Sequence, residues 1–140
     1  MSKKEASFSQ PIVDTLNYAF DEAIQKLNSL HELCPFLLIL NQEGISISDH
    51  DYVDDLQLRY SVATVLKEQA PDGYIVVYDG TIDDGDDVLE AVVCEYATPQ
   101  DETAHIYALP YTFRQNEFMF SDGFGEAGTT KNLFNFNKNV

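Results

Sequence analysis

Basic residues are scarce in this sequence. It contains 8 Lys and Arg against 24 Asp and Glu, which leaves a net charge of −16. Such a chain repels phosphate backbones and anionic membrane surfaces, so we expect neither nucleic acid nor a membrane among its partners. The longest uncharged apolar stretch, residues 33–40, is far shorter than the about 20 residues that span a bilayer. No apolar run follows the lysines near the start, so we expect no signal peptide and a cytoplasmic protein.

Cysteine motifs are also lacking. Cys34 and Cys94 stand far apart with no C-x-x-C spacing, which favours neither a redox motif nor a zinc site. Apolar residues flank both cysteines, and we expect both to behave as small buried hydrophobic residues. We expect no cofactor.

The common catalytic motifs are missing as well. The sequence has no G-x-S-x-G, no Walker loop and no S-x-x-K. His31 begins an H-E pair, but Pro35 stands where H-E-x-x-H requires the second histidine. His50 lies between two aspartates and His105 lies in a predicted strand. We therefore expect no catalytic residue and no metal ligand, although spacing alone leaves convergence of the histidines in space open.

The composition is that of a folding chain. With 140 residues, 44% apolar and 12% aromatic, the sequence predicts one domain over residues 1–140. Residues 1–9 and 129–140 are expected to be mobile tails, with docking on a partner as the alternative for the second.

The first half of the chain shows two helical patterns around a hairpin. Apolar residues at steps of three and four predict a helix over residues 11–33 that Pro35 ends. Residues 36–40 and 45–48 are typical of two strands joined by a turn. A second helix is predicted over residues 51–69.

After Gly73 the apolar period changes to two. The pattern predicts strands at residues 74–78, 88–96, 104–111 and 117–120. Short connections make them antiparallel. The expected fold is therefore α+β, in the order α-β-β-α-β-β-β with a fourth late strand. We expect both helices to pack on one face of the sheet through Val13, Leu16, Phe20, Leu27, Leu56, Tyr60 and Ala63.

This element order is similar to that of roadblock and longin-type domains, in which two helices flank a five-stranded antiparallel sheet. The resemblance is one of element order and implies fold alone. Locally, residues 77–80 (VYDG) with residues 90–95 (EAVVCE) resemble a strand pair in a group of small bacterial proteins with no known activity.

A literal G-x-G-x-x-G is formed by Gly123, Gly125 and Gly128. In a dinucleotide fold this motif follows a strand, opens a helix and needs a βαβ unit of about thirty residues. Only twelve residues follow Gly128. We therefore interpret the segment as a flexible glycine loop.

The acidic charge is concentrated between residues 36 and 102, which carry sixteen acids and two bases. Residues 79–90 offer oxygen donors at five places of a calcium loop, but Asp84 stands where the loop requires glycine. We interpret this run as a solvated turn whose charges keep sheet edges apart, with weak calcium binding as the alternative. The residues predicted to contact a partner are Asp83, Asp84, Asp86 and Asp87.

We expect a non-enzymatic interaction or adaptor protein whose acidic surface meets a basic protein partner. An acidic inhibitor or immunity-type protein that imitates nucleic acid is the first alternative. A small enzyme whose residues converge from separate elements, such as His105, Glu95 and Tyr107, is the second. A homodimer stays open. Five aromatic residues of the late strands are an alternative contact face, although a core position suits most of them better: Tyr107, Tyr111, Phe113, Phe118 and Phe120.

Overall fold

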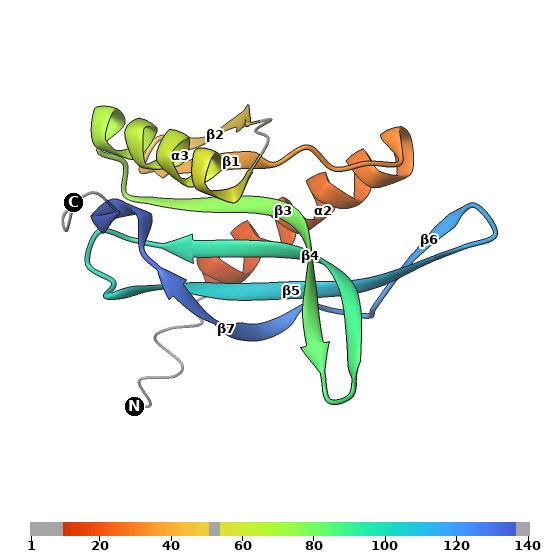
Figure 1. Ribbon diagram of the computed structural model, residues 1–140. Coiled ribbons are helices and arrows are strands. Elements are labelled where there is room, and N and C mark those ends of the chain that lie inside the picture. Colours follow the sequence, from red (N-terminus) through yellow and green to blue (C-terminus); the bar gives the residue numbers. More distant parts are fainter. Residues whose placement is uncertain (1–9, 51–53, 137–140) are drawn as a thin grey trace.

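The structure is a computed structural model that describes residues 10–50 and 54–136. These residues form α2 (Gln10–Leu30), α3 (Asp55–Gln69), seven strands and a 3-10 helix η1 (Leu133–Asn135). The strands are β1 (Phe36–Asn41), β2 (Gly44–Asp49), β3 (Gly73–Asp84), β4 (Asp87–Ala97), β5 (Thr103–Arg114), β6 (Glu117–Phe120) and β7 (Gly125–Lys131). The predicted α+β class and element order are confirmed, with β7 and η1 added (Figure 1).

All strands join one antiparallel sheet, as predicted. The order is β2-β1-β3-β4-β5, and β5 then pairs with β7 over its first half and with β6 over its second half. Two hairpins extend past the sheet, β3–β4 and β5–β6 (Figure 1). The β5–β6 turn places Gln115 and Asn116 at φ 52° and 66°, the two positive angles of a type I′ hairpin.

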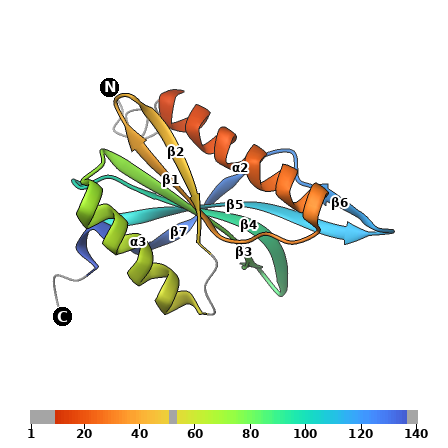
Figure 2. The ribbon, with the colours of Figure 1, turned by 90° about the horizontal axis from the view of Figure 1, so that it is seen from above.

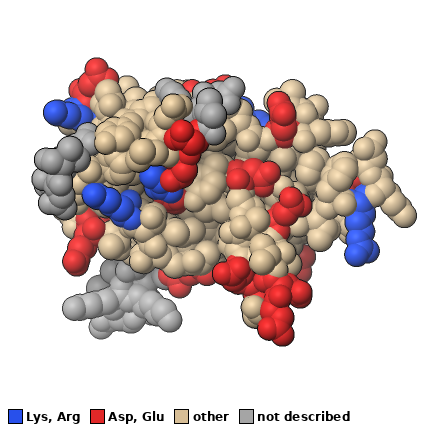
Figure 3. Space-filling view, viewed as in Figure 1, with Lys and Arg blue, Asp and Glu red and all other residues tan. Residues whose placement is uncertain are grey.

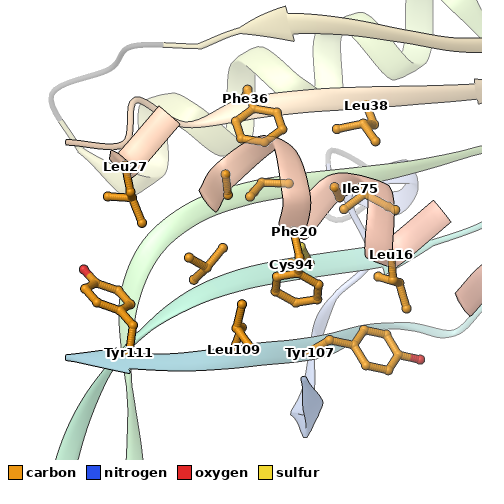
Figure 4. Packing of buried hydrophobic residues seen from close by; sticks show 14 residues of the cluster. Leu16, Phe20, Leu27, Phe36, Leu38, Ile75, Cys94, Tyr107, Leu109 and Tyr111 are labelled. Atoms are coloured by element: carbon orange, nitrogen blue, oxygen red, sulfur yellow. The ribbon is translucent and has the colours of Figure 1, made fainter. Parts of the chain in front are cut away.

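Helix α2 covers one face of the sheet, which we call the α2 face. Its buried Leu16, Phe20 and Leu27 pack there as the apolar spacing predicted, while Val13 is only half-buried. Figure 4 shows these side chains against alternate strand residues. The buried strand residues of this cluster are Phe36, Leu38, Ile75, Val77, Val92, Cys94, Tyr107, Leu109 and Tyr111.

Helix α3 covers the opposite face, which we call the α3 face (Figure 2). The expectation that both helices share one face is therefore wrong. Leu56 and Tyr60, which were expected to face the sheet, are 58% and 45% exposed. The helix instead buries Leu58, Val62 and Leu66 against the strand residues Leu37, Ile39, Tyr74, Val76, Ala97 and Ala104.

A left-handed residue ends α2, and a carboxylate caps the start of α3. His31, at φ 60°, donates its backbone N–H to Leu27 O at 2.8 Å, so α2 stops three residues before the predicted end. At α3 the Asp54 carboxylate accepts from Gln57 N at 2.8 Å and caps the first turn. The predicted helical residues 51–53 lie outside the described part. No helix in the described ranges is long and apolar enough to cross a membrane.

The C-terminal segment differs from the tail expected over residues 129–140. Residues 129–131 belong to β7, and Leu133 is buried against the α3 face. Asn132 is 1% exposed, and its Nδ2 donates to Thr98 O and Asp101 O at 2.9 and 2.8 Å. The segment therefore docks on its own sheet as far as residue 136. Residues 1–9 and 137–140 lie outside the described part.

The glycine segment is likewise a strand and not a loop over most of its length. Gly125 and Gly128 lie in β7, which pairs with β5 and carries a bulge opposite Ile106 and Tyr107. Gly128 has φ 121°, an angle that side-chain-bearing residues rarely adopt. The glycine spacing thus serves a bulged edge strand.

Candidate functional site: the acidic arm

The acidic residues predicted to contact a partner lie on one two-stranded arm. Strand β3 pairs with β1 only as far as Val77, and β4 pairs with β5 only from Ala91. Residues 80–90, which we call the acidic arm, therefore pair only within the β3–β4 hairpin among the described strands. The arm holds five acids and no base. It bends from the sheet toward the α3 side (Figures 1 and 2).

The tip of the arm is a two-residue turn. Gly85 has φ 65°, which fits a type II′ turn with glycine at the first central position. Asp84 and Asp87 stand directly opposite each other on either side of this turn. Like charges at such a pair are destabilising, so the local strand pairing does not explain why both residues are acidic.

The root of the arm is anchored to the sheet. The Tyr111 hydroxyl donates to Asp79 Oδ1 at 2.7 Å, joining β5 to β3. Burial and the bond to Asp79 raise the pKa of Tyr111, so the hydroxyl keeps its proton and the bond over the whole neutral range. The bond therefore restrains the arm where it leaves the sheet.

Beyond the root, the arm's carboxylates face solvent. Asp83, Asp84, Asp86 and Asp87 are exposed, and none of the ion pairs between described residues includes them. Figure 3 shows a cluster of red acidic side chains where the arm projects at the lower edge of the molecule. The structure thus gathers the four predicted partner-contacting residues in one place.

The arm does not form the loop that the calcium alternative requires. Its residues alternate between the two sides of a paired ribbon, whereas a calcium loop wraps its donors around one centre. Within residues 10–50 and 54–136, no three His, Cys, Asp or Glu side chains are grouped so that they could hold a metal ion.

A buried ion pair that was not predicted from the sequence lies beside the arm on the α3 face. Arg59 of α3 donates to both oxygens of Glu95 at 2.9 and 2.8 Å and to Asp55 at 2.8 Å. Glu95 is only 1% exposed. The Tyr78 hydroxyl donates to Glu95 as well. Hydrogen bonding to Glu95 raises the pKa of Arg59, and burial raises that of Tyr78, so both groups keep their protons.

One signal for this pair was available. Glu95 interrupts the apolar run of β4, and a charge in a buried strand needs an opposite charge nearby. Arg59 and Lys67 are the two bases of the acidic middle region. Which of the two bases pairs with Glu95 depends on which face of α3 turns toward the sheet.

The three residues named for a small enzyme do not converge. His105 and Tyr107 occupy alternate positions of β5 on the α2 face, where Tyr107 joins the buried cluster. Glu95 points to the α3 face and is held by Arg59. The sheet separates the two sets, so this catalytic grouping is wrong.

His50 links β2 to α3. Its Nε2 lies 2.9 Å from the Ser48 hydroxyl and its Nδ1 lies 3.1 Å from the Ser61 hydroxyl. His50 is 8% exposed as a residue; burial lowers its pKa, and the charge of Asp49 partly offsets this by raising it. A neutral ring donates one of these bonds and accepts the other. The arrangement joins two elements at the edge of the sheet.

The late aromatic residues are mostly core, as the sequence favoured. Tyr107 and Tyr111 are buried, Phe118 and Phe120 pack against the same cluster, and Phe113 is 45% exposed. Cys94 is a buried hydrophobe as expected, and burial raises the pKa of its thiol. Cys34 is only partly buried.

No family model, curated protein or solved structure matches this chain. The likeness in element order to roadblock and longin-type domains and the local likeness to small bacterial proteins therefore stay predictions.

Proposed function

We propose that this chain is a non-enzymatic, cytoplasmic interaction protein that binds a basic protein partner through its acidic arm. The observation that carries the proposal is the projection of exposed carboxylates on a ribbon anchored at its root. Charge of one sign on one surface speeds encounter with an oppositely charged partner and disfavours wrong ones.

The pairing at the arm tip supports the same proposal. Asp84 opposite Asp87 breaks a local rule of strand pairing. Departures from local rules without local compensation are expected at functional sites. A basic partner would neutralise this repulsion when it binds, so binding would be favoured by relief of an existing cost.

The proposal is tested by comparing two variants with equal net charge. The arm variant replaces Asp83, Asp84, Asp86 and Asp87 with Asn. The control variant removes four exposed acids outside the arm: Asp21→Asn, Glu43→Gln, Glu68→Gln and Asp122→Asn. Both have a net charge of −12, four above −16.

Each immobilised protein is then exposed to cell extract at low salt, and retained proteins are eluted with a salt gradient. We expect basic proteins that the wild type and the control variant retain equally and that the arm variant loses. Equal loss by both variants would reduce the effect to total charge, and equal retention by all three proteins would show that the arm's carboxylates do not matter. Either result would contradict a role for the arm.

The alternative of an inhibitor that imitates nucleic acid makes a narrower prediction. The retained partner would itself bind nucleic acid, and added duplex DNA would displace it from this chain. A partner that DNA does not displace contradicts the alternative and leaves the main proposal in place.

A further inference from the structure

A groove lies on the α3 face between the acidic arm and β7. Its volume is about 410 Å³. Val93 and Ile106 lie on its floor, and the arm contributes one wall. The lining residues are Tyr78, Thr81, Ile82, Asp83, Val93, Ile106, Glu126 and Ala127.

A second hollow adjoins the groove. It has a volume of about 260 Å³ and shares Ile82, Glu126 and Ala127 with the first. From these residues it continues past Ala108 and Pro110 of β5 to the segment that precedes β7. The two hollows therefore adjoin each other along the arm and β7.

One wall of the groove is held in place by the buried ion pair. Tyr78 borders the groove, and its hydroxyl is bonded to Glu95, which Arg59 holds in turn. A wall that is already ordered loses little conformational entropy when a ligand binds.

The chemistry of the lining selects a cation with an apolar stem. Ile82, Val93 and Ile106 offer apolar surface, and Asp83 and Glu126 bring two acids. Among the residues that the structure describes, no lysine or arginine lines either hollow. Lys and Arg place a hydrocarbon stem on apolar surface and keep the charged head near water or a carboxylate.

We propose that this groove binds a segment of the partner protein in which a lysine or arginine is flanked by apolar residues. The hydrocarbon stem of this lysine or arginine lies over Val93 and Ile106, and its cationic head lies toward Asp83 or Glu126. This inference rests on the proposed function, because it specifies which part of a basic partner the arm brings in. The arm supplies the encounter, and the groove supplies selectivity.

The test uses three capped synthetic peptides and the full chain. One alternates valine with lysine, a second replaces every valine with serine at the same charge, and a third replaces every lysine with glutamate. We expect the valine–lysine peptide to bind at least about tenfold more tightly than the serine–lysine peptide, a difference of about 1.4 kcal/mol. The glutamate peptide should not bind.

Two matched variants locate the binding. Ala127→Phe fills the groove, and Thr129→Phe puts the same ring on the same strand at a position that lines neither hollow. We expect Ala127→Phe to remove the preference for valine over serine and Thr129→Phe to keep it. If Ala127→Phe fails to fold, Thr81→Lys in the groove wall and Thr112→Lys on β5 make the same comparison with equal charge.

Nuclear magnetic resonance of the labelled protein separates the outcomes. Shifts at Val93, Ile106 and Ala127 on addition of the valine–lysine peptide support the groove. Shifts confined to the arm tip, with equal binding of the valine and serine peptides, overturn the groove and leave the arm's function standing. If neither lysine peptide binds at low salt, the proposed function fails as well.

Discussion

At the scale of single residues, Arg59 and Glu95 form a buried ion pair on the α3 face. Both oxygens of a carboxylate that is 1% exposed accept from one guanidinium. Removing one partner of such a pair leaves the other charge buried without compensation. We therefore expect the pair to fix the position of α3 on the sheet more than it adds to net stability.

We predict that Arg59→Met costs about 3–5 kcal/mol of unfolding free energy, because Glu95 is left unpaired. The double variant Arg59→Met with Glu95→Leu should recover a large part of this loss, since no buried charge remains. Urea denaturation of the two single variants and the double variant measures the coupling. Additive losses would show that the pair is not coupled.

His50 gives a prediction in pH. Burial lowers its pKa below the ordinary 6.5, so folding favours the neutral ring. The stability that this ring contributes is present above pH about 6.5 and is lost as the pH falls below that value. We expect wild type to lose stability relative to His50→Gln between pH 7 and 5, as read from thermal melts. Parallel profiles would contradict this.

Sequence reasoning reached some residues and not others. The apolar spacing of α2 identified Leu16, Phe20 and Leu27, because a long stripe on one helix depends only on local periodicity. The inward face of α3 was misjudged, since its apolar residues are spread around the helix. Leu56 and Tyr60 fit a helical spacing as well as Leu58 and Val62 do. Packing against the sheet determines which set is buried.

At the scale of elements, the two-sided burial of the central strands explains the position of the helices. Residues 36–39 and 74–77 are apolar without interruption and are buried throughout. Such runs are typical of strands covered on both faces, whereas alternation indicates one covered face. This signal was in the sequence, and it predicts helices on opposite faces.

The C-terminal segment could not be placed from its sequence, because Leu133 lies among asparagines. We predict that Leu133→Ala costs about 2–5 kcal/mol, the usual range for emptying a buried leucine site. Leu30→Ala is the matched control, since Leu30 is 67% exposed and its change should stay within about 0.5 kcal/mol. If Leu133→Ala is as mild as Leu30→Ala in urea denaturation, the docking of η1 is contradicted.

The acidic arm leads to a prediction about stability. Asp87→Asn removes the like-charge pair with Asp84 and empties no core volume. We expect the unfolding free energy to rise by about 0.2–1 kcal/mol. Asp122→Asn, an exposed change outside the arm, is expected to do less. Thermal melts at low salt measure both, and a destabilised Asp87→Asn would contradict like-charge repulsion at this pair.

At the scale of the whole molecule, the net charge of −16 acts against the compact state. We predict one cooperative thermal transition whose midpoint rises as salt is added at neutral pH, because screening relieves the repulsion. Scanning calorimetry at several salt concentrations tests both parts. Two transitions would contradict a single domain, and a midpoint independent of salt would contradict the repulsion.

The amount of acidic charge is readable from composition, but its position in space is not. The acidic residues are visible in the sequence of residues 79–90. Their projection beyond the sheet depends on where β1 and β5 stop pairing with β3 and β4. The groove depends on β7 as well, and its glycines favoured a loop in the sequence. The position of the site therefore follows from the strand pairing and not from the sequence pattern alone.

The association rate of the captured basic partner tests the central claim most directly. It is measured for wild type, the arm variant and the control variant across a series of salt concentrations. We predict that the wild-type rate falls steeply with salt, that the control variant follows it, and that the arm variant is at least about tenfold slower at low salt with a nearly flat dependence. An arm variant with the rate and salt dependence of wild type would contradict the account.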